Sequence, residues 1–271
     1  MRGILWSLLL VSGWAMENNY GNAISAWRQQ RETRLRAEDG WLSVSGLFWL
    51  KEGVNRIGAA ADNDVVLPAS APAHVGVVTL KSKRAEFGGK VLKSDKEGGP
   101  DVIAAGKMKL LLLERGGRLA LRLKDPGSAL RREFAGCKWY PVNERWRIVA
   151  KLEPAPAARK VAYETVIGTE EELPSAGVAV FQRDDREYRV ELMQEGRELW
   201  LVFRDGTSGK TTYGGARQLY AERLGTDRVV LDFNKAMNLP CAFTPFATCP
   251  IAPKQNRLTL PIEAGELKYK D

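Results

Sequence analysis

A glycine-rich stretch in the C-terminal half of the chain, FRDGTSGKTTYGGAR at residues 203–217, gathers side chains that could bind an anion. It contains a carboxylate, two hydroxyl groups and a guanidinium, on Asp205, Thr212, Tyr213 and Arg217. Glycines let backbone N–H groups approach an anion closely, and an arginine can hold a carboxylate or phosphate through two parallel hydrogen bonds. The spacing is not that of the G-x-x-x-x-G-K-[ST] phosphate loop. The alternative is a tight turn with Arg217 in a buried ion pair.

A second polar group follows in LDFNKAMN, residues 231–238. If this segment is a strand, Asp232 and Asn234 point to the same face, and Asn238 follows close by. A carboxylate and amides would then face one pocket. The alternative is that these side chains cap loops. The candidate catalytic residues are therefore Asp232, Asn234, Arg217 and Tyr213, and the candidate ligand-binding residues are Arg217, Tyr213, Thr212, Asp205 and Asn238.

Two of the three cysteines lie in a proline-rich segment, NLPCAFTPFATCP at residues 238–250. Seven residues separate Cys241 from Cys249, which is not the C-x-x-C spacing of thioredoxin-like redox motifs. In an exported protein the simplest use is a disulfide that closes this loop. Two structural thiols, or a metal-binding or catalytic cysteine, are the alternatives. Cys137 is expected to be a small buried hydrophobic residue. His74 is the single histidine, which excludes multi-histidine zinc sites, so we expect no metal and no cofactor.

The first 15 residues, MRGILWSLLLVSGWA, have the layout of a secretory signal. Arg2 supplies the basic start, residues 4–11 the apolar core, and Gly13 and Ala15 the small residues before a cleavage site. The segment is shorter than the ~20 apolar residues that a membrane-spanning helix needs. It predicts an exported, periplasmic or extracellular protein that is not transmembrane. A buried N-terminal helix is the alternative.

One helix is predicted next, over residues 16–40. Its inward face carries residues at helical spacing, namely Ile24, Trp27, Arg31 and Leu35. The DG pair at the end of this segment is expected to stop the helix.

The rest of the chain has the period-two pattern of β-strands. Hairpins are predicted in KMKLLLLERGGRLALRLKD and in YRVELMQEGRELWLVF, and further strands in RWRIVAKLEP, DRVVLDFN and NRLTLPIEAGE. No helices alternate with these strands, so the predicted fold is mainly β, an antiparallel sandwich or barrel architecture with one N-terminal helix. The Pro/Ala-rich residues 153–160 are a candidate connector between a first β unit, residues 41–153, and a second antiparallel unit, residues 154–271. One continuous β domain is the alternative.

The net charge of +8 raises the question of an anionic partner. Lysines and arginines are scattered among apolar residues, and no basic run accompanies a nucleic-acid-binding motif, so we expect no nucleic-acid partner. The first hypothesis is a non-catalytic protein that binds a small anionic ligand or a protein partner near the C-terminal motifs. The second is a hydrolase that uses Arg217, Asp232 and Asn234. Whether the protein is an enzyme stays open.

Residues 53–80, GVNRIGAAADNDVVLPASAPAHVGVVTL, resemble the opening of a forkhead-associated domain. That family is a β-sandwich whose loops hold phosphothreonine. The family has an arginine where this chain has Ala59, and a serine where it has Ala71. A phosphate needs charge-assisted donors at fixed positions, and these are missing. The resemblance therefore implies a sandwich over residues 41–153 without phosphopeptide binding.

A longer resemblance runs from Trp41 to the end of the chain. It rests on GWLSVSGLFWLKEGVNRIG, REFAGCKWYPVNERWRIVAKLEP, FRDGTSGKTTYGGARQLY and LDFNKAMNLPCAFTPFATCPIAPKQNRLTLPIEAGE. These stretches are similar to the bacterial and archaeal proteins grouped as domain of unknown function 1684. The resemblance implies a shared scaffold whose most distinctive motifs lie in the C-terminal third. It implies no mechanism.

Overall fold

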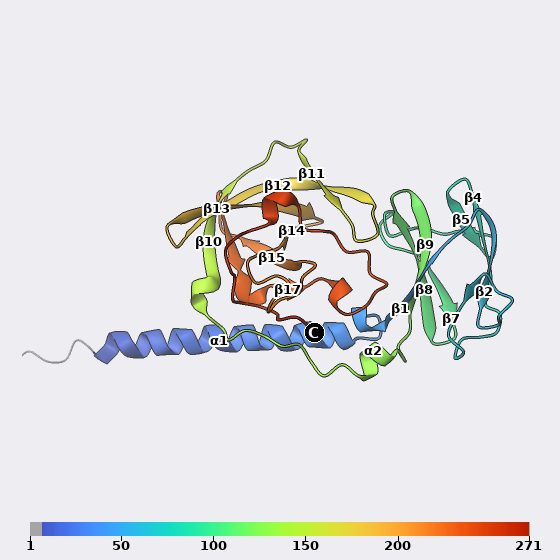
Figure 1. The fold of residues 1–271 in the computed structure, drawn as a ribbon, viewed down its shortest axis with the longest axis horizontal. Helices are drawn as coiled ribbons and strands as arrows, with labels where there is room; N and C mark the ends of the chain where they lie inside the picture. The colour runs from blue at the N-terminus through green and yellow to red at the C-terminus, as the bar shows by residue number, and fades with distance from the viewer. Residues whose placement is uncertain (1–6, 271) are drawn as a thin grey trace, which may run out of the picture.

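The computed structural model describes the backbone of residues 7–270 and the side chains of residues 19–270. Strands make up 43% of the chain and helices 15%, which confirms the predicted mainly β class with one N-terminal helix. In Figure 1, helix α1 (Ser7–Arg36) runs along the larger of two β units, and the smaller unit lies beyond the C-terminal end of that helix. None of the helices within residues 7–270 has the length and apolar character needed to cross a membrane.

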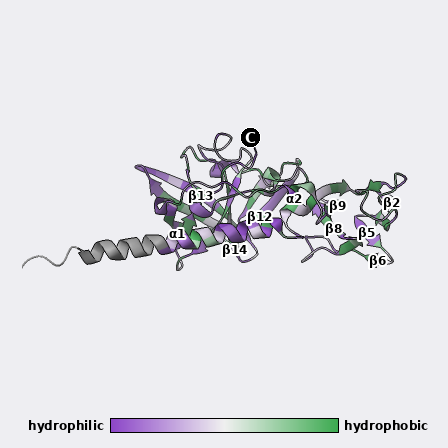
Figure 2. Ribbon diagram, turned by 90° about the horizontal axis from the view of Figure 1, so that it is seen from below, coloured by the Kyte–Doolittle hydropathy of each residue, from purple (hydrophilic) through white to green (hydrophobic). Residues whose placement is uncertain are grey.

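Helix α1 packs through one face. Ile24 and Leu35 on that face are buried, and so is Arg31; Figure 2 shows hydrophobic and hydrophilic residues mixed along the described turns of α1. The chain turns back at Gly40, where a Cβ would lie 2.3 Å from the carbonyl oxygen of Arg34. The helix therefore ends before the DG pair, as predicted. The predicted signal, residues 1–15, lies partly outside the described residues and stays a prediction.

The smaller unit is a sandwich of two sheets, with strand orders β1-β9-β8-β7 and β3-β2-β4-β5-β6. The strands are β1 (Val44–Trp49), β2 (Gly53–Gly58), β3 (Val65–Val66), β4 (Gly76–Lys81), β5 (Arg84–Phe87), β6 (Lys90–Val91), β7 (Val102–Ala105), β8 (Met108–Arg115) and β9 (Arg118–Lys124). All neighbours are antiparallel except β2 and β3. Both sheets contribute to one core, in which Ile57 and Val78 of one sheet join Leu110 and Leu121 of the other.

Both predicted hairpins are confirmed. Strands β8 and β9 meet at the pair Arg115 and Arg118, and Gly116 and Gly117 between them have φ of +54° and +71°. Two positive φ values in a two-residue loop match the right-handed twist of the flanking strands, and glycine adopts them without strain. The second hairpin joins β13 to β14 through a turn that contains Gly196.

The larger unit is a closed barrel of six antiparallel strands in the order β10-β16-β15-β14-β13-β12, closed by pairing of β12 with β10. The strands are β10 (Arg147–Glu153), β12 (Glu170–Arg183), β13 (Arg186–Glu195), β14 (Glu198–Phe203), β15 (Arg217–Arg223) and β16 (Arg228–Asp232). Strand β11 (Lys160–Glu164) extends along β12, and β17 (Met237–Asn238) pairs with β15. Because β10 belongs to this sheet, the barrel begins before the predicted connector at residues 153–160.

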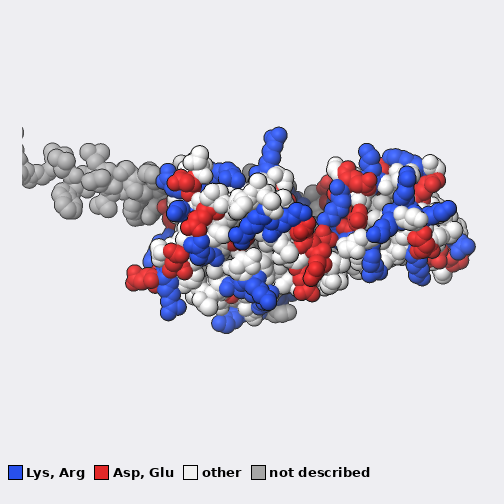
Figure 3. All heavy atoms as spheres, turned by 90° about the horizontal axis from the view of Figure 1, so that it is seen from above, with Lys and Arg blue, Asp and Glu red and all other residues white. Residues whose placement is uncertain are grey.

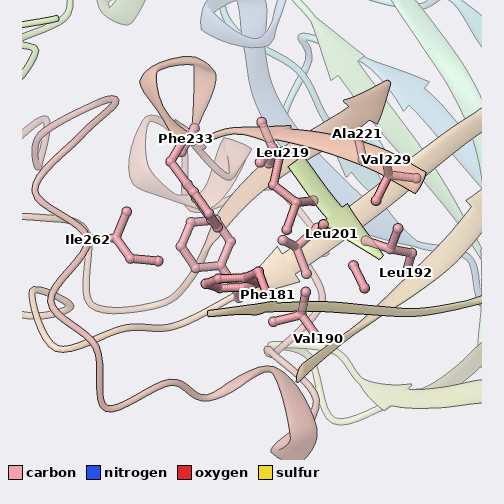
Figure 4. Close-up of a cluster of buried hydrophobic side chains, with 14 of the residues drawn as sticks. Phe181, Val190, Leu192, Leu201, Leu219, Ala221, Val229, Phe233 and Ile262 are labelled. Atoms are coloured by element: carbon pink, nitrogen blue, oxygen red, sulfur yellow. The ribbon is translucent and has the colours of Figure 1, made fainter. Parts of the chain in front are cut away.

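Phe233 lies at the centre of the barrel core. Its ring is 5.5 Å from that of Phe203 and 6.2 Å from that of Phe181, measured between centroids. Figure 4 shows aliphatic side chains of the barrel strands, such as Leu201 and Val190, gathered beside the rings of Phe181 and Phe233. A filled barrel of this kind holds a packed core and no internal channel.

Two predicted strands end differently from expectation. Strand β16 stops at Asp232, whose carboxylate accepts a hydrogen bond from the backbone N–H of Asn234 (3.2 Å) and so caps the 3-10 helix η3 (Phe233–Lys235). The prediction that Asp232 and Asn234 share a strand face is therefore wrong. Residues 257–267 form no strand. Leu258 and Leu260 still bond backbone to backbone with Arg204 and Gly206, but at Ile262 side chains take over: its N–H donates to Asp205 (2.7 Å) and its carbonyl accepts from Arg217.

The remaining short elements connect these units. They are the helix α2 (Ala129–Arg132) and the 3-10 helices η1 (Trp41–Ser43), η2 (Glu144–Trp146), η4 (Pro240–Ala242) and η5 (Lys254–Asn256). The surface seen in Figure 3 has basic side chains interspersed with acidic ones on both β units, without a continuous basic face.

Candidate functional site

Arg217, the predicted anion clamp, is buried against the C-terminal segment of its own chain. Its Nη2 lies 3.3 Å from a carboxylate oxygen of Asp205, and neither side chain has exposed surface. The guanidinium also donates to the carbonyl oxygens of Ile262 (3.0 Å) and Ala264. Burial lowers the pKa of Arg217, and the charge of Asp205 opposes that shift. These contacts correspond to the alternative in which Arg217 forms a buried ion pair.

The glycine-rich segment around Asp205 is a tight turn. The hydroxyl of Thr207 donates to the Asp205 carboxylate (2.9 Å) and lies 2.8 Å from the hydroxyl of Thr212, which is fully buried. Tyr213 is half-buried, and its ring packs on Gly215, where a Cβ would lie 2.5 Å from the ring. The hydroxyl of Thr212, expected to meet a ligand, therefore helps to hold the turn together, and Tyr213 contributes its ring.

Asp232 and Asn234 join three distant segments. The hydroxyl of Tyr20 in α1 donates to Asp232 (2.8 Å), and burial together with this carboxylate raises the pKa of Tyr20. The amide of Asn234 donates to the carbonyl of Asn143 (2.8 Å) and accepts from its N–H (2.9 Å). Both side chains are almost fully buried, and neither lines any of the cavities described below.

Asn238 secures the tail of the chain. Its side-chain amide donates to the carbonyl of Leu267 (2.8 Å) and to the carboxylate of Glu266 (3.2 Å), and its backbone carbonyl accepts from Arg31 (3.1 Å). Glu266 is buried, and burial raises its pKa. The half-buried thiol of Cys137 belongs to the same cluster, and burial and Glu266 raise its pKa. Asn238 is thus held by the chain's own groups.

The thiols of Cys241 and Cys249 lie next to each other and are both free. The backbone N–H of Cys241 donates to the sulfur of Cys249 at 3.1 Å. A hydrogen bond between the two side chains raises the pKa of Cys249 and lowers that of Cys241. The predicted disulfide between them stays a prediction.

A cleft of about 420 Å³ lies where the sandwich, the barrel and the Cys/Pro loop (residues 240–250) meet. The sandwich contributes Arg115 and Arg122, the barrel Tyr163 and Trp200, and the loop Thr248 and Cys249. The volume lies within the range of about 300–1,000 Å³ that is typical of small-molecule sites. Of the predicted site residues, Cys249 lines this cleft.

Arg122 of β9 is the unusual group in the cleft. It is 8% exposed, and its guanidinium carbon lies 5.0 Å from the ring centroid of Trp41. One terminal nitrogen contacts the hydroxyl of Thr248 at 3.4 Å, and the buried Nε has no hydrogen-bond partner. Among the described side chains, no carboxylate lies within 4.0 Å of it. Burial and the neighbouring charge of Arg115 lower the pKa of Arg122 to about 10, so it is charged at neutral pH.

Arg115 of β8 gives the cleft a second guanidinium. It pairs with Asp95 at 2.7 Å and donates through Nε to the hydroxyl of Thr248 at 3.0 Å. Thr248 thus accepts from both arginines, although one hydroxyl cannot satisfy two guanidinium groups. The charge of Arg115 is balanced within the protein, whereas that of Arg122 is not. A buried cation without a partner is costly, and a bound anion would relieve that cost.

A larger cavity, of about 680 Å³, lies between α1 and β15. Its buried or half-buried cations already have partners, since Arg31 pairs with Glu266 and Lys235 with Glu222. Arg34 at its edge is exposed to solvent. The smaller cleft is therefore the better candidate site, because its Arg122 is buried and has no ion-pair partner, although Asp95, Glu171 and Glu195 also line the cleft.

The sequence pattern did not reveal Arg122. In RLALRLK it occupies a polar position of a period-two strand, which predicts an outward-facing, solvated side chain. The structure buries both faces of β9 from Leu119 to Leu123. Only the packing of the Cys/Pro loop and Trp41 over the outer face, which the strand pattern does not encode, makes Arg122 a buried charge.

The family described as Protein of unknown function (DUF1684) matches residues 132–267. The chain belongs to this family. The DUF1684 match covers the barrel and the Cys/Pro loop, and so the side of the cleft that carries Thr248 and Cys249. The matched residues do not include Arg122. The similarity expected from Trp41 to the end of the chain is therefore shown only for residues 132–267. Residues 53–80 also lie outside the match, and their resemblance to forkhead-associated domains is not confirmed.

No curated protein matches the DUF1684 chain. An uncharacterised protein of Haloarcula marismortui, known from a solution NMR structure, is similar at 25% identity, over 51% of this chain and 78% of its own, with a TM-score of 0.41. That likeness adds nothing to the description of the cleft.

Proposed function

We propose that this DUF1684 protein binds a small anionic ligand in the cleft between the sandwich and the barrel, with Arg122 as the central contact. The observation that carries the proposal is the buried guanidinium of Arg122, which has an unpartnered Nε and no carboxylate within ion-pair distance. A guanidinium offers donors in a planar fork that matches carboxylate and phosphate groups.

The walls of the cleft suit a ligand that carries an apolar or aromatic body beside its anionic group. Trp41, Tyr163 and Trp200 line the cavity next to the two arginines. Aromatic side chains supply large apolar contact areas and favour ring stacking. Phenyl phosphate combines both properties and is the probe of choice.

The hydrolase hypothesis gains no support from the geometry. Asp232, Asn234 and Arg217 are hydrogen-bonded within the folded chain and do not line the cavities described above. The proposed function is therefore ligand binding and not hydrolysis.

Export remains part of the proposal on the ground of the sequence. The layout of residues 1–15 is that of a secretory signal. Cell fractionation tests the predicted export. The full chain is expressed, and the mass of its N-terminal peptide is measured in each fraction. Recovery of a chain shortened near Ala15 outside the cytoplasm is the expected result, and an intact cytoplasmic chain would contradict it.

A thermal-shift measurement tests the binding function. Phosphate, phenyl phosphate, benzoate and neutral benzyl alcohol are compared at equal ionic strength. A ligand that binds only the folded chain stabilises it by about 2.7 kcal/mol at 100 times its Kd. We expect the anions to raise the Tm, phenyl phosphate most, and benzyl alcohol to leave it unchanged. Equal effects of all four compounds and of sodium chloride would contradict the proposal.

A further inference from the structure

The Cys241–Cys249 pair sits beside the cleft and is asymmetric. Cys249 is 5% exposed and lines the cleft, whereas Cys241 is half-buried and more accessible. The loop that carries them is fixed, because the N–H of Val166 donates to the carbonyl of Cys249 at 2.9 Å and Thr165 bridges to Pro250. The two sulfurs are therefore held together by the backbone, without needing a bond between them.

The surroundings favour a thiolate at Cys241. Its pKa is lowered first by the hydrogen bond from the Cys249 thiol, and also by the charge of Arg122. The same hydrogen bond and burial raise the pKa of Cys249. The ring of Tyr213 is the other titratable group that senses both thiols, and burial raises its pKa. Two adjacent thiols, of which the more accessible one has the lowered pKa, are the arrangement of a thiol–disulfide exchange site.

We propose that Cys241 and Cys249 are a redox-active dithiol that exchanges with small-molecule disulfides, with Cys241 as the attacking sulfur and Cys249 as the resolving one. This differs from a permanent staple, because both the dithiol and the disulfide would form in the folded protein.

The exchange proceeds in two balanced steps. The Cys241 thiolate attacks one sulfur of a disulfide RSSR, forms a Cys241–S–S–R bond and expels RS⁻. Cys249 gives its proton to RS⁻, and its sulfur attacks the sulfur of Cys241, which forms the internal disulfide and expels the second RS⁻. That thiolate takes up the proton that Cys241 released to solvent. Two protein thiols are oxidised, and one RSSR is reduced to two RSH.

Oxidation would also change the cleft. Cys241 and Cys249 act on the charge of Arg122, and a thiolate there competes with an anionic ligand for the guanidinium. The disulfide carries no charge, so the oxidised form should bind phenyl phosphate more tightly than the reduced form. This part rests on the proposed function, whereas the exchange chemistry does not.

The exchange is tested with oxidised and reduced glutathione on the folded full chain, followed by acid quench and peptide mass mapping. We expect the wild type to form the internal disulfide with oxidised glutathione and to lose it with reduced glutathione. Cys249→Ser should accumulate glutathione on Cys241. Cys241→Ser should react more slowly at Cys249 than Cys249→Ser reacts at Cys241, because the sulfur of Cys249 is the less accessible of the two. Cys137, half-buried and of raised pKa, serves as the unreactive reference.

Labelling of the wild type with iodoacetamide provides a test that does not depend on whether the variants fold. We expect Cys241 to be modified before Cys249. A disulfide that resists reduced glutathione, no disulfide at all, or equal reaction of the two variants would overturn the exchange proposal. Titration with phenyl phosphate at pH 9 then compares the two redox forms. We expect roughly two- to fivefold tighter binding by the oxidised form. Equal affinity of the two forms would contradict the coupling between redox state and anion binding, but not the exchange chemistry. No binding of phenyl phosphate to either form would contradict the proposed function.

Discussion

The guanidinium of Arg217 lies 3.3 Å from the carboxylate of Asp205, with both side chains fully buried. Together they hold residues 262–264, because Asp205 accepts from the N–H of Ile262 and Arg217 donates to the carbonyls of Ile262 and Ala264. This ion pair continues the attachment that begins with the backbone hydrogen bonds of Leu258 to Arg204 (2.8 Å) and of Gly206 to Leu260 (3.0 Å). The C-terminal segment is thereby fixed to the barrel through both backbone and side-chain groups.

Removal of Arg217 should destabilise the fold strongly. Arg217→Met leaves the Asp205 carboxylate buried and unpaired, and loss of one partner of a buried pair costs about 3–5 kcal/mol. Urea unfolding followed by tryptophan fluorescence measures the loss. Arg197→Met, at an exposed position in the β13–β14 turn, is the matched control and should change stability by less than about 0.5 kcal/mol. Equal stability of the two variants would show that the ion pair has no structural role.

Asn256 should be a second fixed point of the barrel. Its amide donates to the carbonyls of Glu191 (2.9 Å) and Val202 (3.0 Å), and its oxygen accepts from the N–H of Glu191 (2.7 Å). Asn256→Ala leaves these buried groups without partners, so a loss of about 1–3 kcal/mol or more is expected. The exposed neighbour Gln255 provides the control variant Gln255→Ala. Equal chemical denaturation midpoints would contradict the expectation.

Two glycines near the N-terminal helix should respond in opposite directions to alanine. At Gly21, inside α1, a Cβ would meet nothing within 4 Å, so Gly21→Ala should stabilise the protein by about 0.5–1 kcal/mol. At Gly40 a Cβ would lie 2.3 Å from a backbone oxygen, so Gly40→Ala should destabilise it. Thermal unfolding of the pair is the measurement. A shift of the same sign in both variants would contradict the described turn.

Anion binding should depend on pH through Arg122. Burial and the charge of Arg115 lower the pKa of Arg122 to about 10. The charges of Asp95, Cys249 and Cys241 act in the opposite direction. The folded chain therefore binds fewer protons than the unfolded chain between about pH 10 and 12.5. The free energy of unfolding should rise with pH across this range, because the buried guanidinium loses its charge. Since the ligand needs the charged form of Arg122, the affinity of the oxidised protein, which has no Cys241 thiolate, for phenyl phosphate should be constant from neutral pH to about pH 9 and fall above about pH 10. Calorimetric titrations across this range check it, and a decline already at neutral pH would point to another group.

Local patterns were sufficient to predict the local elements. The period-two alternation and the paired glycines of residues 116 and 117 predicted the β8–β9 hairpin, because turn geometry and strand pattern act over a few residues. The spacing of Ile24 and Leu35 likewise predicted the buried face of α1. The alternation before Asp232 predicted β16, but not the capping bond that ends it.

The candidate site depends on contacts that no local pattern encodes. Arg217 could be a ligand clamp or an internal anchor, and only the return of Ile262 and Ala264 to it decides. Arg122 could be a solvated strand residue, and only the packing of Thr248, 126 residues away in the chain, makes it a buried charge. The sequence predicted a disulfide in the Cys/Pro loop, with a metal-binding or catalytic cysteine as one alternative, and gave no sign that the loop packs against the other β unit.

The central claim is that Arg122 holds an anion in the cleft. Isothermal titration with phenyl phosphate compares the wild type with Arg122→Gln and with Arg118→Gln, an exposed arginine on the same strand that stacks on Trp49. Both variants lose one positive charge, so a general effect of net charge affects them equally. We expect Arg122→Gln to weaken binding at least about tenfold, or about 1.4 kcal/mol, and Arg118→Gln to leave it within about twofold. Equal affinities of the two variants would contradict the claim.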